Sequence, residues 1–166
     1  GSNYYGYFTS GTFTADSSNV FWYTPTSTVV KVSAHAEVNA SSTDYVMYCF
    51  HSVEGYSKVG TYEGNANNNG PFVYTGFKPA MVIAKCADAV SSWDIVDNKR
   101  DPDNGVIQRL FPNNTSADDV SAGVMVDFLS NGFKVRTTSG NWNSGTSHTQ
   151  LYIAFAESPF KTANAR

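Results

Sequence analysis

The chain has 166 residues, of which 15% are charged, and its formal net charge is -3 with no run of lysine or arginine. These features exclude a basic surface for a nucleic-acid backbone, so we expect no nucleic-acid partner. No apolar run approaches the roughly 20 residues that span a bilayer, and the N-terminus lacks the pattern of a signal peptide. We therefore expect a soluble protein without membrane insertion, whose residues 1–166 form a single domain.

Serine, threonine, asparagine, glycine and tyrosine are abundant, which is typical of short strands joined by hydrogen-bonding turns. From the N-terminus onward, the pattern of aromatic, apolar and small polar residues predicts strands in residues 4–8, 20–23 and 29–38. Gly1-Ser2 resembles the remnant of a cleaved expression tag, so we interpret the chain as a fragment of a longer protein.

The least polar stretch of the chain is residues 43–52, which we predict to be a buried aromatic strand. Its pattern recurs in residues 148–158, and residues 30–33 align with residues 133–136. A hairpin used twice in one all-β body would explain this repetition. Because any two antiparallel hairpins look alike at this level, both explanations stay open.

The chain between and after these stretches also has the pattern of strands, and no helical period lasts more than a turn or two. The expected strands are residues 56–63, 72–74, 80–86, 93–97, 106–111, 123–128 and 133–137. We predict an all-β fold, a β-sandwich or jelly-roll of about ten short antiparallel strands. The residues expected in its core or at its edges are Val46, Tyr48, Phe50, Val82, Ile83, Ala84, Ile153 and Phe155.

The two cysteines, Cys49 and Cys86, each lie in an apolar run, where a free cysteine behaves as a small hydrophobic residue. We interpret both as core thiols, with a disulfide between them as the open alternative. Without a CxxC motif or a Cys/His pair at ligand spacing, no structural zinc is expected.

The sequence carries none of the catalytic signatures that we compared with it, such as GxSxG, a P-loop or HExxH. Four carboxylates gather around one turn, and a pair of them would suit glycoside cleavage. We prefer a solvated turn cluster over such a pair, and we expect no enzymatic activity, no cofactor and no bound metal. These carboxylates belong to Asp94, Asp97, Asp101 and Asp103.

Trp142 differs from the other aromatic residues because it lies in a polar loop with almost nothing apolar to pack against. An indole among amides and hydroxyls is the composition that stacks on a sugar ring and bonds its hydroxyl groups. The alternative is that Trp142 covers the core or lies in a subunit contact. The predicted ligand-binding residues are Trp142, Asn141, Asn143, Ser144 and His148.

Residues 48–65 (YCFHSVEGYSKVGTYEGN) resemble a module of tailed-bacteriophage tail-fibre and related virion proteins. The stretches 76–79 (GFKP) and 97–102 (DNKRDP) resemble two of its turns. Its last strands are resembled by residues 128–134 (FLSNGFK) and 152–161 (YIAFAESPFK). The resemblance covers residues 43–166, and residues 1–42 resemble only the end of a preceding, degenerate copy.

This resemblance implies a non-enzymatic virion component, a distal tail-fibre module that serves host-surface attachment or fibre assembly. The partners it implies are two further copies in a homotrimer, other fibre segments and a host cell-surface glycan or protein receptor. Two alternatives from other classes remain: a polysaccharide depolymerase, and a carbohydrate-binding module of a cellular enzyme.

Overall fold

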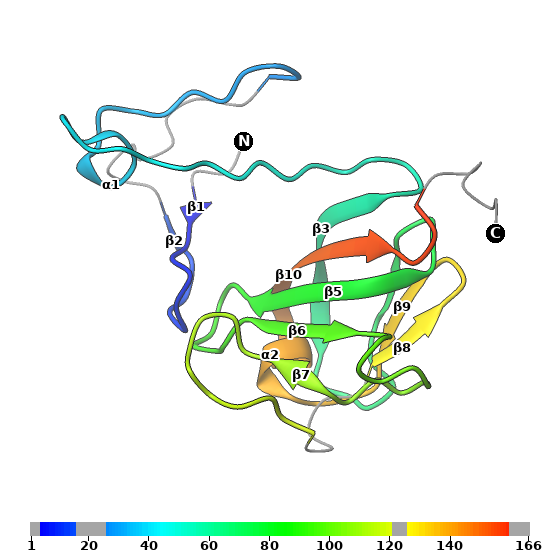
Figure 1. Ribbon diagram of the computed structural model, residues 1–166. Coiled ribbons are helices and arrows are strands. Elements are labelled where there is room, and N and C mark those ends of the chain that lie inside the picture. Colours follow the sequence, from blue (N-terminus) through cyan, green and yellow to red (C-terminus); the bar gives the residue numbers. More distant parts are fainter. Residues whose placement is uncertain (1–3, 16–25, 121–125, 160–166) are drawn as a thin grey trace. The chain divides into compact units, whose positions relative to one another are not determined.

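The computed structural model describes residues 4–15, 26–120 and 126–159 (Figure 1). Strands account for 37% of the chain and helices for 6%, so the predicted all-β class is confirmed. The ten strands of the described part all pair antiparallel. The predicted strand at residues 20–23 lies outside the described residues.

Contacts divide the chain into two units. The first consists of Gly1–Tyr7 and Phe13–Cys49, and the second of Phe8–Thr12 and Phe50–Arg166.

The first unit contains little regular structure. Strand β1 (Tyr4–Tyr5) pairs with β2 (Thr14–Ala15), and a single short helix, α1 (Ala36–Asn39), follows in the described part. The side chain of His35 caps α1 by accepting a hydrogen bond from the backbone N–H of Glu37. None of the described residues of this unit is buried.

Two predicted strands are therefore wrong. Residues 29–38 contain only coil and the start of α1, and residues 43–52 contain no strand. Val46 and Tyr48, both predicted in the core, are each 80% exposed, and Phe50 is 58% exposed. The apolar pattern of this stretch is typical of a strand, but the described residues provide neither a neighbouring strand nor a covering layer for it. The hairpin is consequently not used twice.

The second unit is built from two antiparallel sheets (Figure 1). The larger, five-stranded sheet has the order β3-β10-β5-β6-β7, and the smaller has the order β4-β9-β8. The strands of the larger sheet are β3 (Ser57–Asn65), β5 (Pro79–Cys86), β6 (Asp94–Asp97), β7 (Arg109–Leu110) and β10 (Thr146–Ala156). The strands of the smaller sheet are β4 (Phe72–Tyr74), β8 (Val126–Leu129) and β9 (Gly132–Val135). A second short helix, α2 (Gly140–Asn143), precedes β10.

The core lies between the two sheets. Successive side chains of a strand point to opposite faces, so alternate residues of β10, among them Tyr152 and Ala154, are buried. Their partners on β5, Ala84 and Val82, are buried as well, which confirms these two predicted core residues. The smaller sheet contributes Val73, Val126, Phe128, Phe133 and Val135.

The other face of the larger sheet is only half-covered. Ile83 on β5 and Ile153 and Phe155 on β10 point to it, and each is half-buried. These three residues therefore lie on the face opposite the core, and they are not part of the cluster that fills the space between the sheets. The pattern predicted them correctly as apolar strand positions, but periodicity alone does not tell how much cover each face receives.

The cysteines differ in their environments. Cys86 ends β5 and is fully buried, as predicted for a core thiol, whereas Cys49 is exposed and the same prediction is wrong for it. Both thiols are free, so no disulfide joins them. In the described part of the chain no helix is long and apolar enough to cross a membrane.

Phe133 tests this account of the core, because its ring is fully buried and lies 5.4 Å from the ring of Tyr152. We expect Phe133→Ala to lower the free energy of unfolding by about 3–5 kcal/mol, since it removes apolar contacts and leaves a cavity. Urea denaturation measures this loss. The control is Tyr74→Ala on the neighbouring strand β4, where the side chain is 64% exposed and the loss should be small. Equal losses in both variants would contradict the proposed core.

Candidate functional site

The predicted ligand-binding loop is part of the packed structure. Residues 140–143 form α2, and β10 begins at residue 146. Trp142 has no exposed surface, and its indole lies against Phe133 with a centroid distance of 6.4 Å. The prediction of an indole that stacks on a sugar is therefore wrong, because the ring fills the core instead. The alternative hypothesis, that Trp142 packs onto the core, is correct.

A buried carboxylate explains why an indole is needed here. Trp142 Nε1 donates a 2.8 Å hydrogen bond to Oδ2 of Asp94, which has no exposed surface. Asn141 Nδ2 donates to the other oxygen at 3.0 Å, and Arg109 forms an ion pair with Oδ2 at 3.2 Å. Burial raises the pKa of the Asp94 carboxyl above its ordinary value, and the guanidinium and the hydrogen bonds oppose this rise. These bonds attach α2 to β6 and β7.

Asn143 is the second buried polar residue of α2, and its amide joins three segments. Its Oδ1 accepts hydrogen bonds from the backbone N–H groups of Asn65 and Ala66, at 2.6 and 3.2 Å. Its Nδ2 donates to the backbone carbonyls of Asn67 and Thr137, both at 2.8 Å. With these partners inside the protein, the amide is not available to a sugar, so this ligand-binding prediction is also wrong.

The remaining predicted ligand-binding residues stay partly accessible. Ser144 and His148 are half-buried, and Ser144 Oγ lies 3.1 Å from His148 Nδ1. The thiol of Cys86 lies 3.2 Å from the same hydroxyl, and Gln150 Nε2 donates to it at 3.4 Å. Asn141 is half-buried as well, but its amide is engaged with Asp94. The structure thus brings Ser144 and His148 together. The aromatic ring of this loop, that of Trp142, is buried and does not lie exposed beside them.

The acidic turn cluster is also held by internal bonds. Burial raises the pKa of Asp97, but hydrogen bonds from the backbone and guanidinium of Arg100 outweigh this and hold the pKa below its ordinary value. Asp101 accepts a 2.9 Å hydrogen bond from the backbone of Ile107. Only Asp103 is fully at the surface. In the described chain no three His, Cys, Asp or Glu side chains gather as metal ligands would.

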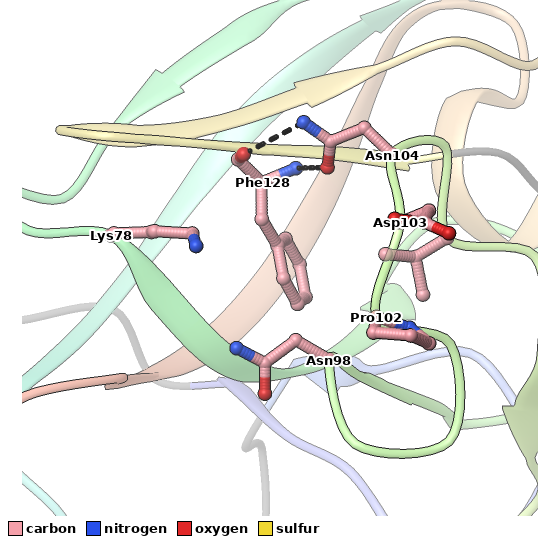
Figure 2. Close-up of a pocket in the computed structure, with 7 residues that line it drawn as sticks. Lys78, Asn98, Pro102, Asp103, Asn104 and Phe128 are labelled. Carbon is pink, nitrogen blue, oxygen red and sulfur yellow. Dashed lines mark hydrogen bonds between the residues drawn. The ribbon is translucent and has the colours of Figure 1, made fainter.

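A polar pocket lies beside this turn (Figure 2). Its volume of about 170 Å³ has room for several water molecules or one small polar molecule. Figure 2 shows Asn104 joined to the backbone of Phe128 by two hydrogen bonds, of 2.8 and 3.0 Å, which hold the turn against β8. The lining residues are Lys78, Asn98, Pro102, Asp103, Asn104, Val106 and Phe128. Of the two charged lining residues, Lys78 forms a 2.8 Å ion pair with Glu157 and Asp103 is exposed.

The burial of one charged residue, Lys85, was not predicted from the sequence. Lys85 has no exposed surface, although it stands within an apolar strand. Its ammonium group donates to the carbonyl of Cys86 at 2.7 Å and to Ser91 Oγ at 3.0 Å. Burial lowers the pKa of this lysine. The hydrogen bonds close the turn after β5, so we assign Lys85 a structural role.

The most unusual surface is the apolar segment of residues 45–50. Its large side chains are all exposed: Tyr45 by 45%, Val46 by 80%, Met47 by 52%, Tyr48 by 80% and Phe50 by 58%. Single exposed apolar residues are ordinary, but five large ones within six successive residues are not. This segment, and not the Trp142 loop, is the strongest candidate functional site.

The fold and this surface define an all-β, sandwich-like protein that exposes an apolar segment. Residues 6–159 match the family described as "Domain of unknown function (DUF7483)", and the chain belongs to this family. The match includes most of the first unit, so residues 45–50 are part of the family's domain. Searches of curated proteins and of solved structures found no match.

The buried Trp142–Asp94 bond generates a prediction about stability. We expect Trp142→Phe to lower the free energy of unfolding by about 1–3 kcal/mol or more, because a buried carboxylate oxygen loses a donor that water cannot replace. Asn141→Ala is the control, since it removes a hydrogen bond to the same carboxylate at a half-exposed position. Urea denaturation of both variants gives the comparison. If Trp142→Phe were as stable as the parent, the hydrogen bond would have no structural importance.

Proposed function

We propose that this chain is a non-enzymatic structural module of a tailed-bacteriophage fibre, which assembles with two further copies of itself and faces the host surface. The resemblance of residues 43–166 to fibre modules supports the setting. The exposed apolar residues of the first unit support the proposal that the chain assembles with copies of itself.

One observation carries the proposal. Not one described residue of the first 50 is buried, although this part of the chain is rich in tyrosine, phenylalanine and valine. Burying a single large apolar side chain contributes roughly 1.5–3 kcal/mol, so residues 45–50 represent a considerable unused driving force. These residues lie within the stretch that matches the family, and we infer that a partner covers them.

The charge pattern favours a partner that is itself apolar. Residues 1–50 contain four charged side chains, those of Asp16, Lys31, Glu37 and Asp44. Such a surface offers little for electrostatic recognition of an oppositely charged partner. Closed symmetric assemblies of identical chains are the commonest soluble oligomers, and the fibre resemblance makes the trimer our choice among them.

The arrangement of the carboxylates favours this proposal over a depolymerase. Glycoside cleavage needs an acid and a base or nucleophile that both reach the substrate. Asp94 is buried against Trp142, and Asp97 is bound to Arg100 at 2.6 Å. The pocket beside Lys78 and Asp103 is the polar surface that we assign to contact with host glycans, in place of the buried Trp142.

A sedimentation experiment tests assembly. We expect the parent protein to have three times the 18.0 kDa mass of one chain, and a variant with Val46→Glu and Tyr48→Glu to fall to the mass of one chain. Two charges placed on the exposed apolar segment would have to be desolvated in the assembly but not in the free chain. Analytical ultracentrifugation over a wide concentration range measures the masses.

The matched control is Val90→Glu, which charges an equally exposed apolar residue, 76% accessible, in a loop of the second unit. This variant should keep the parent's mass. A parent protein that stays at 18.0 kDa at all concentrations would contradict the proposed assembly.

Immunogold electron microscopy tests the virion setting. Antibodies against this chain should label the fibres of the phage particles that carry its gene, because the module is proposed to be a part of the fibre. Antibodies against the major head protein of the same particles serve as the control and should label heads only. Release of new reducing ends from host polysaccharide by the purified chain would instead support the depolymerase.

A further inference from the structure

We propose that residues 45–49 of one copy, here called the arm, add as a strand to the outer edge of β3 in a second copy. This inference rests on the self-assembly proposed above and specifies the surface through which it occurs. It is carried by an open strand edge, by the place where the chain leaves that edge, and by the composition of the arm.

The outer edge of β3 is open in the described structure, because β3 ends the five-stranded sheet. Backbone groups of an antiparallel strand point alternately to its two neighbours. The backbone of Ser57 exchanges hydrogen bonds of 2.9 and 3.0 Å with Val53, on the side away from β10. By this alternation Thr61 and Glu63 direct their N–H and C=O groups to the same outer side, and both residues are exposed.

The chain's own preceding residues leave this edge at Ser52. A regular hairpin continuing from the Val53–Ser57 pair would place a backbone opposite Val59. Instead, the hydroxyl of Ser52 accepts from the N–H of Val59 at 3.1 Å and donates to its carbonyl at 3.3 Å. A side chain thus satisfies Val59 and ends the pairing, and the backbone beyond it is left for another strand.

Phe50 shows where the chain goes next. Its ring contacts that of Phe155 with a centroid distance of 6.2 Å. Phe155 points to the half-covered face of the sheet, opposite to the buried face on which Tyr152 lies. Phe50 therefore holds the chain at that face, and the division between the two units falls directly before it.

The open stretch of the edge has a limited length. Ser52 covers Val59 at one end, and Asn143 covers the backbone N–H of Asn65 at the other. The backbone between them, residues 60–64, leaves the outward groups of Thr61 and Glu63 without a neighbouring strand in the described structure. An edge this short suits a short strand such as the arm.

The composition of the arm suits such a strand. Tyr45, Val46 and Tyr48 are aromatic or β-branched residues, which are enriched in strands. In the register that continues the Val53–Ser57 pair, Cys49 would lie opposite Thr61 and Tyr48 opposite Tyr62. Tyr62 belongs to the aromatic cluster with Phe133 and Tyr152. The exposed ring of Tyr48 would then extend the core of the second copy, which provides the driving force for the addition.

A disulfide test follows directly, because Cys49 is an exposed free thiol and Cys86 is buried. Residues in a hydrogen-bonded antiparallel pair have Cα atoms about 5.5 Å apart, within the range that a disulfide spans. We expect Thr61→Cys, after mild oxidation, to form disulfides between chains, so that a non-reducing gel shows bands at two and three times 18.0 kDa. Adding Cys49→Ser to this variant should abolish the bands.

Tyr74→Cys is the control, because it places a thiol on an exposed position of the other sheet and should give no such bands. A disulfide within one chain would overturn the inference by showing that the arm pairs with its own β3. The absence of any disulfide, with the sedimentation mass still that of three chains, would overturn the docking site but not the assembly. A sedimentation mass of one chain would overturn both.

A second variant tests the same edge without relying on disulfide formation. Thr61→Pro removes the outward N–H that the arm would need, while proline is tolerated on an edge strand. We expect its sedimentation mass to fall toward 18.0 kDa and its circular dichroism spectrum to keep the strand signal of the parent. A Thr61→Pro protein that remains three chains in mass would overturn the inference.

Discussion

The hydrogen bond between the Trp142 indole and the buried carboxylate of Asp94 is the constraint on which the rest of the second unit depends. A charge without water must be surrounded by donors, so α2, β6 and β7 have to meet at this point. Asn143 lies next in sequence and its amide then binds residues 65–67 and Thr137. One short helix thereby connects the larger sheet to the loops before β4 and after β9. The polar loop that separates two strands in the sequence is thus a packed element of the fold.

The two units are stabilised in different ways. The second has a core between two sheets, with residues from seven strands in contact. The first has hydrogen bonds, such as those of the Tyr45 hydroxyl to the backbone of Ala36 and Ala40, but no buried side chain among its described residues. A segment that cannot bury apolar surface by itself can do so only against another surface. This difference connects the fold to the proposed assembly, in which the first unit would gain cover that its own described residues do not supply.

Most strands of the second unit could be predicted because their information is local. The local pattern of apolar and polar residues identified β3, β5, β6 and β9 to within a few residues. The same reasoning failed for residues 43–52. Their pattern is that of a strand, but a pattern does not provide the neighbouring strand and the second layer that a buried strand requires. The candidate site was misplaced for a related reason, since neighbours in sequence did not show what Trp142 packs against.

The sequence by itself determined the all-β class and the positions of most strands in the second unit, since side-chain alternation and turn residues act over a few positions. Only the tertiary structure decided that Trp142 and Asn143 are buried. Their partners, Asp94 and Asn65, lie 48 and 78 residues away, and no local pattern pairs residues at such separations. The tertiary structure also decided that the least polar stretch is exposed, because burial depends on the layers that surround a segment and not on the segment's own composition.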